Sequence, residues 1–520
     1  MKKYVFYPIL FGVNPILLVF SANVSDLPLA ILFPGMVIVP LLCGGLFALL
    51  ARITKDTHRS GYVVFLLEIW FFHYGTVHLM ASPHLSRLVE INAHWLLIPI
   101  WTLTFLLLGS HLVWKKVTSP QTITSFLNAL ALTLVIFSAG RIILDVIPRY
   151  VNRPISSDVA QAFSQQSQPQ TTPDIYLIIV DGYARQDVLS ALYQFDNQPF
   201  IRELEKRGFQ IPASSKSNYM QTALSLASSL NLDYLNDISA NMPDRGQLIG
   251  KIGHSQVRAV LEGFGYQMIT VSTGYQPTEI TDADSYYALE SVQRSFDFEA
   301  LLAVNSLAKP FFENGWIKLP IGKFHSQQER ILFTFKTLST LAPSTSPRFV
   351  FTHVLTPHPP FIFDENGPIA PDNFYILADG ERLGSNPEAY QYGYTQQIQF
   401  TNHLLLETID QILQNSSKPP IIIIQADHGS GMLLHTAEAE STCHTERFSI
   451  FSAFYLPGQV DQEIPADITP VNIFRLIFNK YFGADFQMLP NKQYYSSWAR
   501  PYQFIDVSEL TDSPCAIPIP

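Results

Sequence analysis

The stretch Pro173-Asp-Ile-Tyr-Leu-Ile-Ile-Val-Asp181-Gly-Tyr183 decides how the second half of the chain folds. Its central residues Ile175–Val180 are apolar or aromatic without interruption, as expected of a strand in a largely parallel sheet. Asp181 follows that strand directly. In open α/β sheets the reactive groups lie just beyond the carboxyl ends of the strands, because the loops there meet in one crevice. The stretch therefore predicts an α/β domain with a functional site where this strand ends.

A second strand ends in a similar way. Ile421–Ala426 runs directly into Asp427-His428-Gly429. Two carboxylates and an imidazole would then meet at one edge of the sheet, and such side chains suit Zn²⁺ or Mn²⁺, with Mg²⁺ less favoured by the imidazole. Either sequence alone is also typical of a plain turn. The joint occurrence of the two strand ends is what indicates a divalent metal site.

Thr222 stands where a polar loop, beginning at Ser217, leads into a short apolar helix that continues to Leu230. Thr222 can be a simple N-cap of that helix. A hydroxyl at a helix N-terminus, beside a divalent cation, is also where an alkoxide is stabilised and a phosphate is bound. The two interpretations are compatible.

A third strand, Phe349–Leu355, delivers polar side chains to a proline-rich loop. The strand and the loop carry one histidine each, His353 and His358, which could ligate a second metal or protonate a leaving group. His353 lies inside the strand and is equally consistent with a hydrogen-bonded core histidine. His358 lies in the loop, so it is the better candidate for a catalytic role.

The remaining pattern is that of an α/β domain, with apolar runs of strand length alternating with amphipathic helices. We expect a further strand at Ile450–Leu456 and helices at Gln198–Arg207, Gln327–Leu341 and Tyr394–Leu413. Residues Leu235–Lys323 contain strand-like runs such as Gln267–Val271 but no motif, and we hypothesise that this stretch shapes an acceptor pocket.

The first half of the chain has a different composition. Only 15% of all 520 residues are charged, and the mean hydropathy of +0.14 is too high for an ordinary soluble protein. Each of five apolar stretches is close to the ~20 residues that a helix needs to cross a bilayer. The stretches are Tyr4–Ser21, Leu27–Leu50, Gly61–Met80, Trp95–Trp114 and Phe126–Ile147. The first could instead be a signal peptide, since Lys2 and Lys3 precede it and small residues end it.

Basic residues lie in alternate loops, and such loops are cytoplasmic. They are Lys2, Lys3, Arg52, Lys55, Arg59, Lys115 and Lys116, with Arg87 as the exception. Everything after Ile147 is then outside the cytoplasm, whether or not the first stretch is cleaved. Charged or imidazole side chains within the stretches are candidates for function: Glu68, His73, His78, Arg141 and Asp145. An ion pair between Arg141 and Asp145, one helical turn apart, is the simpler interpretation of the last two.

We expect three parts: a transmembrane helical domain at 1–149, a linker rich in Ser, Gln and Pro at 150–173, and an extracytoplasmic catalytic domain at 174–520. The net charge of −10 gives no basic field that could hold nucleic acid. The cysteines are Cys43, Cys443 and Cys515. Cys443 and Cys515 could pair in an exported domain, but the sequence alone does not decide this.

Taken in their order along the chain, over roughly residues 173–483, the four motifs resemble the alkaline phosphatase superfamily in its sulfatase-like branch. That branch includes arylsulfatases, nucleotide phosphodiesterases, lipoteichoic acid synthases and phosphoethanolamine transferases. The segments Phe200–Phe209 and Val471–Gly483 are similar to helices at the matching places of such domains. The resemblance implies an N-terminal transmembrane bundle of five helices, all α, and a C-terminal alkaline-phosphatase-like α/β domain with a mostly parallel central sheet.

By this resemblance, the ligands of the principal metal are Asp181, Thr222, Asp427 and His428, and Thr222 is also the nucleophile. Thr222 with Ser225 is similar to the threonine motif of the membrane-bound transferases, and His353 with His358 to their paired histidines. Those transferases commonly have Glu in place of Asp181, so the choice between transferase and hydrolase stays open. His435 or His444 could complete the site, and Arg447 could hold an anionic oxygen.

The motif C/S-x-P-x-R, which sulfatases need for their formylglycine nucleophile, is absent from the sequence. Phosphoester chemistry through threonine is therefore favoured over sulfate-ester hydrolysis. We expect a multi-pass protein of the cell membrane, with its catalytic domain outside the cytoplasm. We expect it to be a metal-dependent phosphoester transferase that acts on phospholipid head groups or cell-envelope glycans through a phosphothreonine. The alternatives are an exported phosphodiesterase, phosphatase or other sulfatase-like hydrolase, and a catalytically silent membrane receptor or scaffold.

Overall fold

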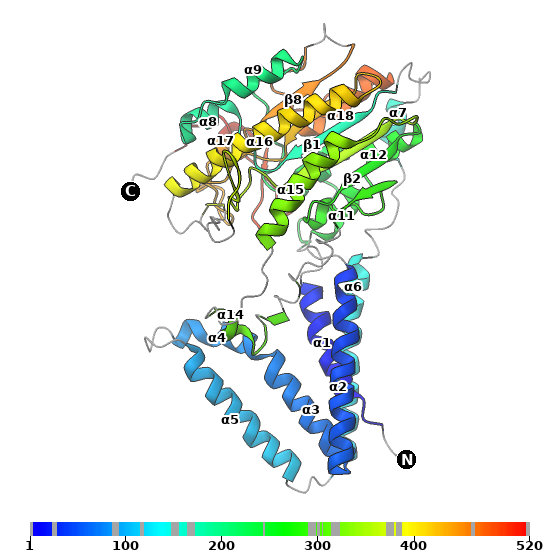
Figure 1. The fold of residues 1–520 in the computed structure, drawn as a ribbon, viewed down its shortest axis with the longest axis vertical. Coiled ribbons are helices and arrows are strands. Elements are labelled where there is room, and N and C mark those ends of the chain that lie inside the picture. Colours follow the sequence, from blue (N-terminus) through cyan, green and yellow to red (C-terminus); the bar gives the residue numbers. More distant parts are fainter. Residues whose placement is uncertain are drawn as a thin grey trace. The chain divides into compact units, whose positions relative to one another are not determined.

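The chain divides into two compact units, which we call the helical unit and the α/β unit (Figure 1). The helical unit comprises Met1–Ile147 with Ser295–Lys323, and the α/β unit comprises Pro148–Arg294 with Phe324–Pro520. The computed structural model describes residues 4–22, 29–85, 93–114, 119–146, 155–163, 172–242, 245–289, 298, 302–303, 305–313, 323–370, 379–380, 387–458 and 463–515. Lys2, Lys3, Arg87, Lys115 and Lys116, on which the predicted orientation partly depends, lie outside this set, as does the side chain of Asp145.

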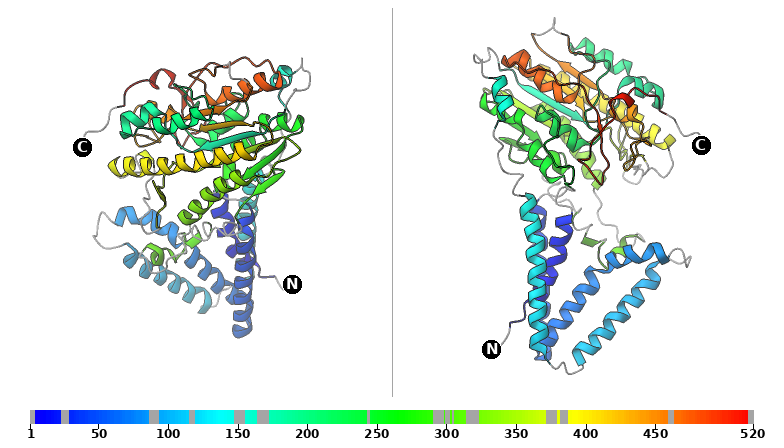
Figure 2. Two further views of the ribbon diagram at one scale, coloured as in Figure 1. Left: turned by 45° about the horizontal axis from the view of Figure 1, so that its top comes forward. Right: turned by 180° about the vertical axis from the view of Figure 1, so that it is seen from behind.

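The helical unit consists of apolar helices (Figure 2). They are α1 (Tyr7–Ala22), α2 (Leu32–Thr54), α3 (Thr57–Phe72), α4 (Tyr74–Leu85), α5 (Ala93–Trp114) and α6 (Pro120–Val146), with the short helices η1 (Leu29–Ile31) and α14 (Lys309–Glu313). Large apolar side chains such as Phe33 and Leu144 are 74% and 77% exposed. Apolar side chains on an outer surface are expected where the surrounding solvent is lipid.

The predicted count of five crossings is not confirmed. Among the described residues, α2, α5 and α6 are each long and apolar enough to cross a membrane. A fourth crossing is formed if α3 and α4, which are bent by 44° at their junction, count as one span. The helix α1 is apolar but has only 16 residues, fewer than the ~20 that a crossing needs. The fifth crossing stays a prediction.

The helical unit also takes in residues from far along the sequence. Phe298 is 1% exposed and packs in a cluster with side chains of α1, α2 and α6. Near the break between α3 and α4, the backbone N–H of Leu307 donates to Phe71 O at 2.7 Å and that of Gly75 to Asn305 O at 3.1 Å. A stretch inside the predicted catalytic domain thus belongs to the helical unit.

The α/β unit is built on a six-stranded sheet with the order β3-β2-β4-β1-β7-β8; β1, β2 and β8 are labelled in Figure 1. Its strands are β1 (Ile175–Val180), β2 (Gln267–Val271), β3 (Ser285–Tyr287), β4 (Arg348–Val354), β7 (Ile421–Ala426) and β8 (Ser452–Tyr455). All neighbours pair in parallel except β8, which is antiparallel to β7. Two small antiparallel pairs join β5 (Phe363–Asp364) with β6 (Gly367–Pro368), and β9 (Tyr494–Tyr495) with β10 (Ile505–Asp506). The mostly parallel sheet is therefore as predicted.

Helices cover both faces of the sheet, which explains why β1 and β7 are apolar along their whole length. Tyr176, Ile178 and Val180 of β1 pack in one cluster, and Ile175, Leu177 and Ile179 in another. The first cluster includes α8 (Gln186–Tyr193), α9 (Gln198–Lys206), α15 (Lys323–Thr340) and α16 (Pro387–Asn415). The second includes α7 (Ser157–Ala162), α10 (Thr222–Leu230), α11 (Gly246–Gly253), α12 (Gln256–Gly263) and α18 (Pro470–Phe482). Further short helices are α17 (His444–Phe448), η3 (Gln276–Thr278) and η7 (Ser508–Leu510).

The segment predicted as a linker contains the helix α7. Its Val159 is 4% exposed and belongs to one of the two clusters beside the sheet, and Phe163 packs edge-on against Phe478 of α18. The polar composition of residues 150–173 hides these few apolar contacts, and polarity alone is therefore a poor guide to where the α/β unit begins.

Candidate metal and catalytic site

Three neighbouring strands place candidate metal ligands together. Asp181 follows β1, Asp427 follows β7, and His353 lies near the end of β4, paired with Ile179. One ligand atom from each of these three residues lies within 4.8 Å of the other two. All three residues are at most 5% exposed. Strand order, rather than any local motif, brings them to one place.

The three side chains fit a divalent cation. Asp181 Oδ1, His353 Nε2 and Asp427 Oδ2 are buried and have no hydrogen-bond partner in the described part of the chain. Buried polar atoms almost always have a partner, and three such atoms that face one another match the ligand set of a metal ion. His353 Nδ1 lies 3.0 Å from Thr278 Oγ1, which leaves Nε2 facing Asp181 Oδ2 at 3.5 Å.

His428 joins this cluster to Thr222. Its Nε2 lies 3.3 Å from Asp427 Oδ2, 3.5 Å from Asp181 Oδ1 and 3.2 Å from Thr222 Oγ1. Its Nδ1 lies 2.9 Å from Gly429 O. A carbonyl oxygen can only accept, so Nδ1 carries the proton and a neutral ring presents the lone pair of Nε2. Burial lowers the pKa of His428, and the charge of Arg447 lowers it further. A neutral imidazole is the form that binds metals.

Thr222 is the first residue of α10, and the N-cap position is taken by Gln221, whose backbone is extended. Thr222 is therefore not the N-cap, and its hydroxyl lies against His428 Nε2 instead. Every later residue of α10, from Ala223 to Leu230, is buried, which fixes the helix and directs its N-terminus toward the cluster. Backbone N–H groups at a helix N-terminus favour negative charge, so the position suits an oxyanion.

His358 lies beside the cluster and is held by the backbone carbonyl of Asp181 and the carboxylate of Asp379. Its backbone N–H donates to Asp181 O at 3.0 Å, and its Nε2 lies 3.2 Å from Asp379 Oδ2. Burial alone would lower the pKa of His358, but the charges of Asp181 and Asp379 outweigh burial and raise the pKa to about 10. The ring is therefore a proton donor at neutral pH in the protein as described.

Asp379 was not among the candidates that the sequence indicated. Its Oδ2 also receives a hydrogen bond from Arg447 Nη1 at 3.1 Å, and its Oδ1 receives one from the Tyr390 hydroxyl at 3.0 Å. Burial would raise the pKa of Asp379, yet the neighbouring charges of His358 and Arg447 hold it well below its usual range. In the sequence Asp379 precedes Gly380 and looks like an ordinary turn residue, so no local signal distinguishes it.

The other candidates lie at different places. Arg447 is 2% exposed. It donates to Met220 O at 2.9 Å as well as to Asp379, so it is fixed in place beside Asp379. His435 accepts from the backbone N–H of Glu438 and receives the Tyr495 hydroxyl on its carbonyl oxygen. His444 is buried against the rings of Phe448 and Tyr495. Neither His435 nor His444 belongs to the group of described residues whose ligand atoms converge.

The cysteines Cys443 and Cys515 form a disulfide bond. Cys443 is the N-cap of α17, and its sulfur accepts from the backbone N–H of Glu446. The bond ties the C-terminal segment to the helix that carries Arg447. Cys43 is a free, buried cysteine of the helical unit.

Searches with models of known families and among curated proteins gave no match for this chain. Solved structures are similar at low identity. The C-terminal periplasmic domain of EcEptC from Escherichia coli shares 11% identity and covers 70% of this chain and 98% of its own, at a TM-score of 0.43. The lipooligosaccharide phosphoethanolamine transferase A from Neisseria meningitidis, an integral membrane protein, shares 12% sequence identity with this chain. The match covers 91% of this chain and 94% of that protein, at a TM-score of 0.40. The phosphonate monoester hydrolase of Agrobacterium radiobacter shares 13% sequence identity with this chain. The match covers 62% of this chain and 80% of that protein, at a TM-score of 0.39.

Proposed function

We propose that this protein is a membrane-anchored, metal-dependent phosphoester transferase that acts on phospholipid head groups or cell-envelope glycans through a phosphothreonine at Thr222. One observation carries the proposal. The hydroxyl of Thr222, at the N-terminus of a buried helix, lies 3.2 Å from His428 Nε2, and His428 in turn lies against the buried carboxylates of Asp181 and Asp427. A nucleophile, an anion-favouring helix end and a set of metal ligands therefore meet.

The metal would be held by Asp181, Asp427, His428 and Thr222, with His353 as a further ligand from β4. Two imidazoles among the ligands favour Zn²⁺ or Mn²⁺ over Mg²⁺. When bound, the metal lowers the pKa of the threonine hydroxyl and stabilises negative charge on the phosphoryl oxygens. His353 extends the ligand set that the resemblance implies, because its Nε2 has no hydrogen-bond partner among the described residues.

The reaction runs in two steps. In the first, Thr222 Oγ1 as its alkoxide forms a bond to phosphorus, the bond from phosphorus to the leaving oxygen breaks, and the leaving oxygen takes the proton held by His358 Nε2. In the second, an acceptor hydroxyl returns a proton to His358 and forms a bond to phosphorus as the Thr222 bond breaks. Arg447 and Asp379 keep His358 in place through the contacts described above.

Membrane anchoring supports a lipid donor, because phospholipid head groups are at high local concentration at the bilayer surface. The disulfide between Cys443 and Cys515 is consistent with a catalytic domain outside the cytoplasm, where disulfides persist. If water takes the place of the acceptor hydroxyl, the same site is an exported hydrolase.

The test is a turnover assay on the full chain purified in detergent, with Mn²⁺ or Zn²⁺ and phospholipids labelled in the head group. Products are identified by mass. The proposal predicts release of diacylglycerol and appearance of the head group on a glycan acceptor. Release of the head group into water in the presence of glycan would favour the hydrolase. No turnover with any metal or phospholipid would remove the proposal.

A further inference from the structure

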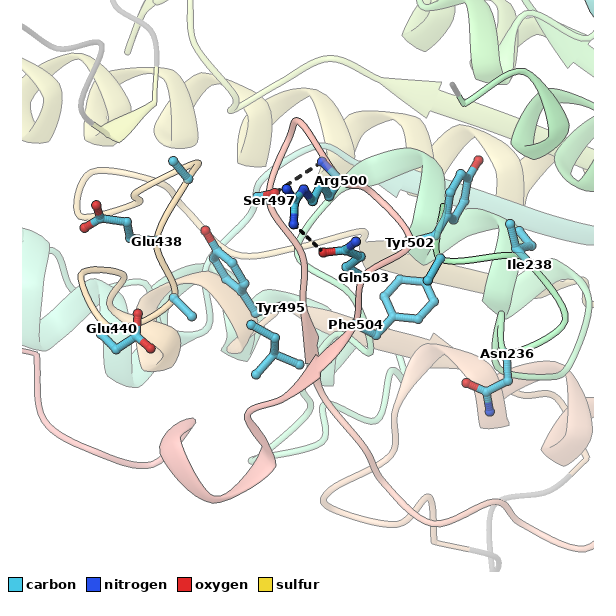
Figure 3. Close-up of a pocket in the computed structure, with 14 residues that line it drawn as sticks. Asn236, Ile238, Glu438, Glu440, Tyr495, Ser497, Arg500, Tyr502, Gln503 and Phe504 are labelled. Carbon is cyan, nitrogen blue, oxygen red and sulfur yellow. Dashed lines mark hydrogen bonds between the residues drawn. The ribbon is translucent and has the colours of Figure 1, made fainter. Parts of the chain in front are cut away.

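A groove of about 760 Å³ lies in the α/β unit, outside the metal cluster (Figure 3). It is lined by three segments: residues 236–240 after α10, residues 437–440 after the Asp-His-Gly turn, and residues 495–505 near the C-terminus. The first of these belongs to the stretch for which a role in an acceptor pocket was hypothesised. The volume of the groove is within the ~300–1,000 Å³ typical of sites for small ligands.

One wall of the groove, residues 495–498, is hydrogen-bonded to Gln221, the residue that precedes the proposed nucleophile. Gln221, which precedes Thr222, donates through Nε2 to Ser496 O at 2.9 Å and to Ser496 Oγ at 3.1 Å. Arg245 Nη2 donates both to Gln221 Oε1, at 2.7 Å, and to Trp498 O, at 3.0 Å. The wall segment 495–498 thus lies between the groove and the start of α10.

The same wall segment is bonded to the other side of the site. The Tyr495 hydroxyl donates to His435 O at 3.0 Å, and the backbone N–H of Trp498 donates to Thr436 O at 3.0 Å. His435 and Thr436 follow the turn that carries Asp427 and His428. The groove is therefore built from the loops that leave the catalytic elements, held together by hydrogen bonds of side chains and backbone.

The lining combines polar and aromatic groups in a way that suits one class of ligand. Glu438 and Glu440 lie at one end and Tyr502 and Phe504 at the other, with Arg500 between them (Figure 3). Carboxylates, amides and a guanidinium offer many acceptors and donors for hydroxyl groups. Tyr502 is 2% exposed and belongs to the wall, so the half-buried ring of Phe504 is the aromatic surface on which the C–H groups of a sugar ring would pack. Sugars present both kinds of surface.

The charge of the lining argues against other ligands. Two carboxylates, those of Glu438 and Glu440, stand against the single guanidinium of Arg500, so the groove does not attract a polyanion or a bare phosphate. An acyl chain would leave these polar groups without water or partner, which is costly. A neutral or amine-bearing oligosaccharide avoids both costs.

We infer that this groove binds the glycan acceptor of the transfer reaction, as a hydroxyl-rich oligosaccharide whose reacting end reaches past the wall segment to Thr222. The inference rests on the proposed function for the word acceptor, but the binding of an oligosaccharide does not depend on catalysis. The groove supplies the selectivity for the acceptor, and the metal cluster supplies the chemistry.

The test fills the groove without removing any contact. Ala437 is exposed and lines the groove, so Ala437→Trp places an indole inside it. Ala191, exposed on α8 and absent from the lining, gives the matched control Ala191→Trp. Binding to the full chain in detergent is measured with fluorescent tetrasaccharides built from glucose, galactose, mannose or N-acetylglucosamine.

We expect at least one tetrasaccharide to bind, with affinity reduced tenfold or more by Ala437→Trp and unchanged by Ala191→Trp. Donor turnover into water should be the same in all three proteins. If Ala437→Trp fails to fold, Arg500→Ala, which removes an exposed side chain with a single side-chain hydrogen bond to Gln503, should weaken the same tetrasaccharide. The inference would be overturned if no tetrasaccharide binds, or if a phosphate ester or a peptide binds in the groove and the tetrasaccharides do not.

The two proposals can fail separately. Oligosaccharide binding that Ala437→Trp abolishes, in a protein without phospholipid turnover, would keep the groove and remove the transferase. Phospholipid turnover with tetrasaccharide binding indifferent to Ala437→Trp would keep the enzyme and remove the groove.

Discussion

In two places in the described part of this molecule, buried carboxylate oxygens have no hydrogen-bond partner, and the two places differ in their neighbours. In the α/β unit, Asp181 and Asp427 face His353 and His428. In the helical unit, Glu68 is 6% exposed, neither of its oxygens has such a partner, and it lies with the Cys43 thiol against Gly12 of α1.

The comparison teaches that burial alone does not make a metal site. An unpaired buried carboxylate is costly wherever it occurs, and the chain offsets this cost in two ways. At the strand ends, several ligand types converge, which suits a cation. Around Glu68 no converging set of three ligands is found among the described residues, and its carboxyl group lies instead beside the Cys43 thiol. The predictions below test this difference, beginning with the largest effect.

Replacing Thr222 with Ala should abolish phosphoester turnover, by roughly 10³-fold or more, because a nucleophile that acts as a unit with its neighbours cannot be replaced. Metal content, measured by mass spectrometry of the purified protein, should fall only in part, because Asp181, Asp427, His428 and His353 remain as proposed ligands. The variant Ser225→Ala, three residues along the same helix, is the control and should keep most of its activity. Normal turnover in the Thr222 variant would remove the nucleophile assignment.

Replacing Asp427 with Asn should lower both metal content and turnover, with activity falling on the order of 10³-fold because a charged ligand is lost. Added Zn²⁺ or Mn²⁺ should restore part of the activity, and a chelator should remove it from the wild type. A variant that keeps its metal at wild-type occupancy would contradict the assignment of Asp427 as a ligand.

Replacing Asp379 with Asn should reduce turnover of a phospholipid by about 10- to 100-fold, the range found for residues that orient catalytic groups. The fall should appear in kcat rather than KM. A p-nitrophenyl phosphoester, whose leaving oxygen needs no proton, should be affected much less. Equal losses on both substrates would show that Asp379 is needed for folding rather than for positioning His358.

Replacing Glu68 with Gln should leave turnover within about twofold of the wild type and leave thermal stability equal or raised by on the order of 1 kcal/mol, since a buried group that can ionise is removed. Activity and melting temperature are measured on the protein in detergent. A large loss of activity would show that the two carboxylate sites are coupled and that Glu68 has a role of its own.

Much of the fold was predictable where a single physical cause acts. The bounds of β1 and β7 match the predicted strands because parallel strands buried on both faces are apolar throughout. The placement of Asp181 and Asp427 follows from the same rule. The position of Asp379 was not predictable, because a loop residue reaches the site only through tertiary contacts with His358, Tyr390 and Arg447.

The helical unit shows a similar limit. Hydropathy identified its apolar stretches, but the break between α3 and α4 falls at His73, where no proline stands and the single glycine nearby, Gly75, is too weak a signal to predict a break. The inclusion of Phe298 in the helical unit depends on packing against Phe20, which no local pattern records. The groove lined by residues 495–505 is likewise assembled from three distant segments.

The central claim is that phosphoester transfer passes through Thr222. The most direct measurement is peptide mass spectrometry of the full chain, quenched with acid during turnover of a labelled phospholipid with Mn²⁺ or Zn²⁺. The account predicts a labelled phosphoester on the peptide that contains Thr222, formed at the rate of diacylglycerol release and absent after Thr222→Ala. Steady turnover with no label on that peptide, and undiminished turnover in the variant, would contradict it.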